Sequence, residues 1–176
     1  MTNLVRPHGS RELKPLIVED KAESEAIIRS SLDTKRLELN SSASANVVML
    51  GAGYFTPLSG FMDKENALNV ARKMQTTEGI FWPIPIMNLS TSEATEFIEG
   101  EELLLLDPNY PDKRPIAIQT VNSVETLTSE ELEIIAENVF GTKDSNHPGV
   151  KNFMHQGSTL IAGPIKVFNY SYFPEE

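Results

Sequence analysis

The sequence of 176 residues contains no cysteine. This absence excludes disulfides, thiolate zinc sites and a cysteine nucleophile. The chain also has no apolar run near the ~20 residues that a membrane-spanning helix needs. Its first ten residues are polar and include Pro7 and Gly9, so they lack the apolar region of a signal peptide. Together these features favour a cytoplasmic protein with no membrane partner.

Basic residues are also scarce. The chain has 15 Lys and Arg against 25 Asp and Glu, which gives a formal net charge of −10. Such a balance repels phosphate backbones and leaves no electrostatic footprint for nucleic acid. The last arginine is Arg114, so the final third lacks the guanidinium fork that binds phosphate or sulfate in bidentate fashion. We therefore expect no nucleic-acid partner.

The three histidines do not form a metal-binding pattern. His147 and His155 are eight residues apart across a proline and a glycine, which does not match an H-x-x-x-H zinc helix. His8 could contact an anion, although a single imidazole in a turn is more often structural. The histidine pattern therefore predicts no metal site.

Other motifs give no catalytic or cofactor-binding residue either. The glycines of residues 51–53 lack the third glycine of a dinucleotide fingerprint, because position 56 is Thr56. No phosphate loop and no G-x-S-x-G nucleophile motif is present. Adjacent glutamates occur at 101–102 and 130–131. Neighbouring side chains on a strand, as at 101–102, point to opposite faces. Acids near a helix N-terminus, as at 130–131, are stabilised by the helix dipole. Neither pair therefore predicts an acid–base dyad.

The pattern of apolar residues predicts an α+β domain in the form of a compact mixed barrel rather than a doubly wound sheet. We expect helices over residues 23–31, 43–50, 63–74, 129–139 and a short one ending near 154. Expected strands cover 16–18, 36–40, 81–89, 103–106, 115–124 and 159–170. The strongest signal is the capping box of Thr128 and Glu131 before an apolar helix that Gly141 closes.

Two finer expectations depend on individual residues. Ser41 and Ser42 are expected to cap the helix over 43–50, and Asp63 is expected to cap the next one. Pro83 and Pro85 remove two N–H groups from one edge of the strand at 81–89, so this strand should pair regularly on one side only.

Residues 51–62, GAGYFTPLSGFM, combine three glycines and a proline with several large apolar side chains. The glycines allow unusual turns, while the apolar side chains require burial. We interpret the stretch as a structural corner rather than a ligand loop. Tyr54, Phe55, Leu58 and Phe61 are expected to pack into the core.

Several stretches, in this order, resemble ATP sulfurylase (sulfate adenylyltransferase). The N-terminal LVRPHGS of residues 4–10, the GAGYFTPLSGFM of 51–62 and the GIFWPIPI of 79–86 are similar to segments of that family. The resemblance continues through residues 107–108, 116–118, 139–150 and 163–165. It covers essentially the whole chain, but it is to the family's N-terminal domain only.

The resemblance implies a PUA-like β-barrel with several short helices over residues 1–169. Residues 170–176 would begin the connection to a catalytic domain, whose motifs Q-x-R-N-P, H-x-x-H and G-R-D are absent here. We therefore expect a structural domain with no catalytic, cofactor-binding or metal-binding residue, inactive alone. Mg-ATP would bind in the full enzyme. The expected partners are that catalytic domain and further copies of the chain.

Some features depart from the family pattern or leave alternatives open. Ser10 stands where the family often has glycine, and the GAGYF form resembles a branch associated with sulfur oxidation. Tyr170, Tyr172 and Phe173 would normally be buried by a further domain, which suggests a fragment or a split chain. The alternatives are a stand-alone PUA-like module that binds RNA or another ligand, and an architectural oligomerisation domain with an exposed apolar patch near residues 170–173.

Overall fold

The computed structural model describes residues 5–31, 33–109 and 114–168. These residues form five α-helices, seven strands and one short 3-10 helix, so the expected α+β class is confirmed. The chain divides into two compact units. Unit 1 comprises Met1–Gly60, Glu102–Thr120 and Pro164–Glu176, and unit 2 comprises Phe61–Glu101 and Val121–Gly163.

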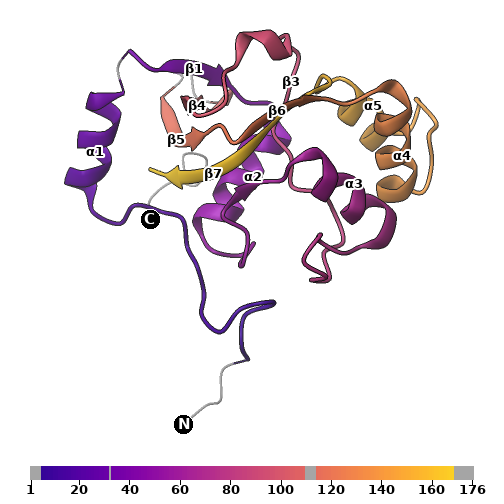
Figure 1. Cartoon of the computed structure of the whole chain (residues 1–176), viewed down its shortest axis with the longest axis horizontal. Coiled ribbons are helices and arrows are strands. Elements are labelled where there is room, and N and C mark those ends of the chain that lie inside the picture. The colour runs from indigo at the N-terminus through magenta and orange to yellow at the C-terminus, as the bar shows by residue number, and fades with distance from the viewer. Residues whose placement is uncertain (1–4, 32, 110–113, 169–176) are drawn as a thin grey trace. The chain divides into compact units, whose positions relative to one another are not determined.

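The sheet of unit 1 contains β1 (Lys35–Glu38), β4 (Glu102–Leu106), β5 (Pro115–Thr120) and the end of β7 (Thr159–Val167) (Figure 1). β1 pairs with β4 in parallel, whereas β4 with β5 and β5 with β7 are antiparallel. The sheet is therefore mixed, as expected. The four leucines 103–106 are all buried, so side chains on both faces of β4 are covered.

Two helices belong to unit 1, α1 (Lys21–Ser30) and α2 (Ser41–Gly51). α2 ends at Gly51, one residue beyond the expected end, and Ala52 is its C-cap. The predicted cap at Ser41 or Ser42 was wrong. Asn40 is the N-cap, because its extended backbone lets the side-chain oxygen accept a hydrogen bond from Ala43 N at 2.8 Å.

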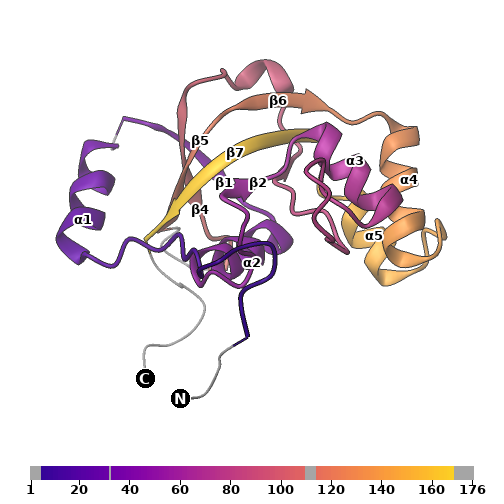
Figure 2. The same cartoon turned by 60° about the horizontal axis from the view of Figure 1, so that its bottom comes forward.

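Unit 2 contains α3 (Lys64–Lys73), α4 (Ser129–Phe140) and α5 (Pro148–Met154). Figures 1 and 2 both show these three helices grouped together. Their predicted ends are confirmed: Asp63 caps α3, the Thr128–Glu131 capping box starts α4, and Gly141 ends α4 with φ 71°. The buried core that these helices share with neighbouring strands consists of Ala71, Leu89, Leu127, Leu132, Ile135, Ala136, Val150, Phe153 and Leu160.

The strands of unit 2 are β6 (Ser123–Thr126) and β3 (Leu89–Ser90), both antiparallel to the first part of β7. The expected strand over 81–89 was wrong. Only Phe81 forms an isolated bridge, to Gln75, before the chain reaches β3. Pro83 and Pro85 remove the N–H groups that a regular ladder needs, so the segment runs irregularly.

Three further predictions differ in detail. Residues 16–18 form only an isolated bridge from Ile17 to Val167 rather than a strand. The expected strand over 115–124 is divided into β5 and β6, because Val121 N turns to Glu101 O and Asn122 N to Ala162 O. The expected end of the last strand at residue 170 and the connection over 170–176 lie outside the described residues.

Candidate functional site

The corner over residues 51–62 is built around Gly53. Its φ of +78° favours glycine, and a Cβ there would approach Leu13 Cγ and Pro15 N to 3.1 Å. Thr56 is buried, and its hydroxyl donates to Gly53 O at 2.7 Å and accepts from Lys14 N at 2.9 Å. The corner therefore holds the N-terminal segment against the end of α2. This geometry supports its interpretation as a structural element.

The side chains of this corner are not all buried as predicted. Phe61 is 4% exposed, in β2 (Gly60–Phe61), whereas Tyr54 is 73% exposed. Phe55 and Leu58 are half-buried. Tyr54 N donates to Met49 O, so Tyr54 still follows the last turn of α2, and its ring lies on the solvent side of that turn. The prediction that Tyr54 packs into the core was wrong.

Unit 2 contains a network of charges between the start of α3 and the start of α4. Lys64 Nζ lies 2.8 Å from Glu131 Oε2 and donates to Thr126 O at 3.2 Å. The same Glu131 oxygen accepts from Thr128 N at 2.8 Å. Lys64 N donates to Glu125 Oε2 at 3.0 Å. Both termini are thus held by charge-assisted hydrogen bonds.

The protonation state of Glu131 follows from these contacts. Burial raises the pKa of Glu131, but hydrogen bonds from Lys64 and Thr128 outweigh it, so the pKa lies below its ordinary value of 4.5. A general acid at neutral pH needs the opposite shift. Sequence reasoning found the capping box but missed Lys64, because no local signal reports a contact across so many residues. The network stabilises the two helix starts.

The three histidines occupy different positions, and His147 and His155 each contact their own helix α5. His147 caps α5, and its Nδ1 accepts from Val150 N at 3.4 Å. His155, at the other end of α5, has Nδ1 2.6 Å from Lys151 O. His8 is exposed in unit 1. Among the described residues, no group of three or more His, Cys, Asp or Glu side chains could hold a metal ion.

The glutamate pairs are likewise explained by local structure. Glu101 accepts from Ile98 N at 2.8 Å, while Glu102 is exposed at the start of β4. Glu130 is exposed beside the capping residue Glu131. That the segment contributes no catalytic residue stays a prediction.

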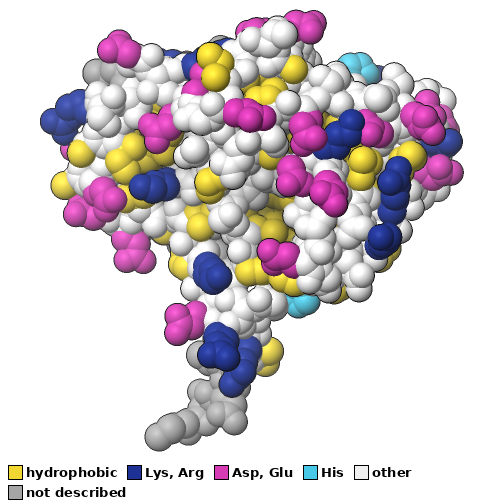
Figure 3. Space-filling view, in the orientation of Figure 1, with side chains coloured by type: hydrophobic (Ala, Val, Ile, Leu, Met, Phe, Trp, Pro, Cys, Tyr) yellow, Lys and Arg dark blue, Asp and Glu magenta, His cyan; other side chains and the backbone are white. Residues whose placement is uncertain are grey.

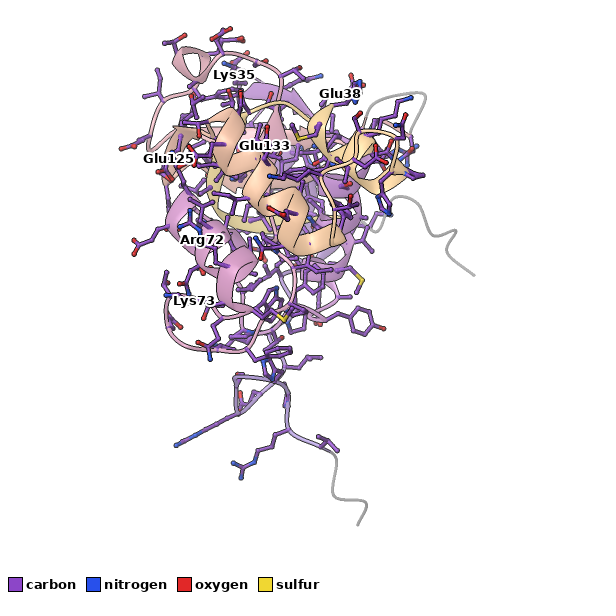
Figure 4. All side chains as sticks on the ribbon, turned by 90° about the vertical axis from the view of Figure 1, so that its right-hand side faces the viewer. Lys35, Glu38, Arg72, Lys73, Glu125 and Glu133 are labelled. Carbon is purple, nitrogen blue, oxygen red and sulfur yellow. The ribbon has the colours of Figure 1, made fainter. Side chains whose placement is uncertain are left out.

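The remaining charged side chains of unit 2 are solvated. Figure 4 shows Arg72 and Lys73 in the last turn of α3, where cations complement the helix dipole. Glu133 of α4 lies 3.8 Å from Lys143, with both side chains about half exposed. Exposed pairs of this kind contribute little to stability.

The helices of the described ranges do not meet the requirements of a membrane span, because none of them has both the length and the apolar character that crossing a membrane needs.

The mixed sheet, the short helices and the glycine-rich corner define the class of protein. The chain belongs to the PUA-like domain family, whose model matches residues 5–170. This match confirms the fold that the sequence resemblance implied.

The curated relatives to which the chain is similar include sulfate adenylyltransferases. The sulfate adenylyltransferase of Alcanivorax borkumensis is 43% identical over 176 residues, covering 100% of this chain and 44% of that protein. That of Allochromatium vinosum is 39% identical over 171 residues, covering 97% of the chain and 43% of the protein. The chain thus spans less than half the length of these curated relatives. It is homologous to their N-terminal PUA-like region.

A solved structure shows the same fold. The hexameric APS kinase from Thiobacillus denitrificans matches with a TM-score of 0.69 and 25% sequence identity. The match covers 98% of this chain and 28% of that one. Both sequence and structure therefore relate the chain to one part of much longer proteins.

Proposed function

We propose that the chain serves as the N-terminal domain of a sulfate adenylyltransferase, which transfers the adenylyl group of ATP to sulfate and releases pyrophosphate. The observation that supports this most strongly is the 43% identity over the whole chain to the Alcanivorax borkumensis enzyme. In this proposal residues 1–169 form the PUA-like domain. The location is cytoplasmic, because the reaction consumes ATP.

The domain's role in this proposal is structural. Adenylyl transfer needs cationic groups and Mg²⁺ to stabilise the charge that spreads over the phosphate oxygens. Among the described residues, the ammonium of Lys64 is held by Glu131 and Thr126. Arg6, Arg11 and Lys14 are exposed on the N-terminal segment. The motifs Q-x-R-N-P, H-x-x-H and G-R-D are absent from the 176 residues. Mg-ATP would bind to the catalytic domain, which is the first expected partner.

The second expected partner is another copy of the chain. Homo-oligomerisation is supported by the structural relative, which is described as hexameric. Most soluble oligomers are symmetric assemblies of one chain. The domain would contribute to assembly while chemistry occurs elsewhere.

The structural role is tested with the purified 176-residue chain. Pyrophosphate release is measured with ATP, Mg²⁺ and sulfate, and a parallel sample without sulfate serves as the control. We expect no sulfate-dependent release. Release that requires sulfate and scales with the amount of chain would show that the segment itself turns over, and the structural assignment would be wrong.

A further inference from the structure

The N-terminal segment of unit 1 is unusual in this acidic chain. Residues 5–14, which we call the basic arm, contain Arg6, Arg11 and Lys14 against the single acid Glu12. The arm has a net charge of +2, so the rest of the chain carries −12 against a total of −10. Figure 3 shows Lys and Arg side chains along the N-terminal segment at the bottom of the view. Within the described ranges, the three basic side chains have no ion-pair partner.

The arm also carries exposed apolar surface at its base. Leu13 is 56% exposed and Tyr54 is 73% exposed. Both lie at Gly53, since Leu13 Cγ is 3.1 Å from the position of a Cβ there and Tyr54 is the next residue. Hydrogen bonds from Lys14 N to Thr56 and from Leu16 N to Gly51 O hold this base in place. Exposed apolar side chains flanked by arginine and lysine form a surface suited to an acidic, partly apolar partner.

The same sequence contains a surface of that chemistry. Residues 93–101 of unit 2, which we call the acidic loop, hold four glutamates and no basic residue. Ile98 in this loop is 68% exposed, and Glu93 and Glu99 are exposed beside it. The loop is anchored by the buried Phe97 and by hydrogen bonds from Ile98 N to the Glu101 carboxylate and from Gly100 N to Val121 O.

We propose that the basic arm of one copy docks on the acidic loop of a second copy. This inference rests on the homo-oligomer of the proposed function and names its contact surfaces. In a two-fold pair each copy supplies one arm and one loop, so every contact occurs twice. Most of the affinity would come from burial of the apolar side chains Leu13, Tyr54 and Ile98, because exposed ion pairs alone add little. The opposite charges would set the orientation and disfavour contacts of arm with arm or of loop with loop.

The test uses charge reversal in the full 176-residue chain, followed by sedimentation velocity at 0.05 M and 0.5 M NaCl. The arm variant carries Arg6→Glu and Arg11→Glu, and the loop variant carries Glu93→Lys and Glu99→Lys. A control variant with Lys21→Glu and Arg29→Glu makes the same change in net charge as the arm variant, on the exposed face of α1. All substituted side chains are exposed, and melting curves check that each variant folds.

The expected result has three parts. Wild type and the control variant form dimers at low salt, and their dissociation constants rise at high salt because the exposed charges are then screened. The arm and loop variants each raise the dimer dissociation constant by about 100-fold or more, because like charges then face each other. An equimolar mixture of the two variants restores a dimer that native mass spectrometry shows to contain one copy of each, since its contact between the reversed arm and the reversed loop regains opposite charges.

Several results would overturn the inference. A wild-type chain that stays monomeric at low salt would rule out the second copy as partner. If both variants form dimers with an unchanged dissociation constant, the proposed homo-oligomer would stand, but arm–loop docking would be refuted. A mixture that remains monomeric would show that the two surfaces do not pair. None of these results bears on whether the chain can replace the corresponding region of a sulfate adenylyltransferase, so the two proposals fail separately.

Discussion

The corner over residues 51–62 makes its clearest prediction through two aromatic residues that lie seven positions apart. Phe61 is 4% exposed and belongs to β2, whereas Tyr54 is 73% exposed at the end of α2. Truncation to alanine removes a ring from a packed environment in the first case and from solvent in the second. The pair therefore separates core packing from the general effect of losing an aromatic side chain.

The magnitude follows from the buried area. A buried aromatic side chain removes about 150–250 Å² from water, which corresponds to roughly 4–6 kcal/mol at about 25 cal/mol per Å². Measured Phe→Ala substitutions in cores cost about 3–5 kcal/mol. We expect Phe61→Ala to lower the free energy of unfolding by about 3–5 kcal/mol and Tm by about 6–20 °C. Tyr54→Ala should change the free energy by no more than about 0.5 kcal/mol.

Urea titration of wild type and both variants, followed by circular dichroism, measures these changes. The slopes of the transitions must agree for the midpoints to be compared. A loss below ~1 kcal/mol for Phe61→Ala would show that this ring does not pack into the core. An equal loss for both variants would refute the difference in burial on which the reasoning depends.

Four further substitutions test local features by the same titration. Gly157→Ala should lower the free energy of unfolding by more than about 3 kcal/mol, because φ is +97° and the new Cβ would collide with the backbone of Ser90 and lie 2.6 Å from Thr91 N. The control Gly141→Ala also has a positive φ but nothing within 4 Å of the new Cβ, so it should cost only about 1–2 kcal/mol. Equal losses would refute the collision. Glu131→Gln should cost about 1 kcal/mol at pH 7, because it removes the charge that pairs with Lys64 and complements the start of α4. The folded-state pKa of Glu131 is lowered, so its carboxylate stabilises the fold above pH 4.5, and the gap to wild type should narrow as pH falls below 4.5; a gap that stays constant down to pH 2 would contradict this. Asn40→Ala should cost about 1 kcal/mol through loss of the α2 cap, and no measurable loss would show that Asn40 is not the cap.

Helix ends were predictable from the sequence because their signals are local. Asp63, the Thr128–Glu131 capping box and Gly141 each act within a few residues of the helix end that they define, and all three were confirmed. Where two neighbouring residues could serve, local reasoning chose wrongly. Asn40, one residue before the predicted serines, caps α2.

Strands depend on partners distant in sequence, and here prediction was weaker. The apolar alternation of residues 81–89 favoured a strand, but the missing N–H groups of Pro83 and Pro85 prevent a ladder. The division between β5 and β6 at Val121 has no local signal, since it depends on hydrogen bonds to Glu101 and Ala162. The prediction that Tyr54 is buried was wrong because composition marks its side chain as apolar but does not say which side of the turn it occupies.

What the chain does could be predicted only from its resemblance to a known family. The motifs of residues 51–62 and 79–86 led to the family that the comparisons show, whereas composition and spacing alone gave no function. The contact of Lys64 with Glu131 could not be predicted, because the two residues meet only once α3 and α4 have packed. The fold and family were therefore accessible from sequence, and the contacts between elements were not.

The central claim is that this chain is the N-terminal domain of a sulfate adenylyltransferase. A chimera tests it most directly: the chain replaces the matching 44% of the Alcanivorax borkumensis enzyme, and sulfate-dependent pyrophosphate release is compared with that of the enzyme lacking this region. We predict that the chimera is soluble and releases pyrophosphate when sulfate is present, well above the truncated enzyme. A folded chimera with no more activity than the truncated enzyme would contradict the claim.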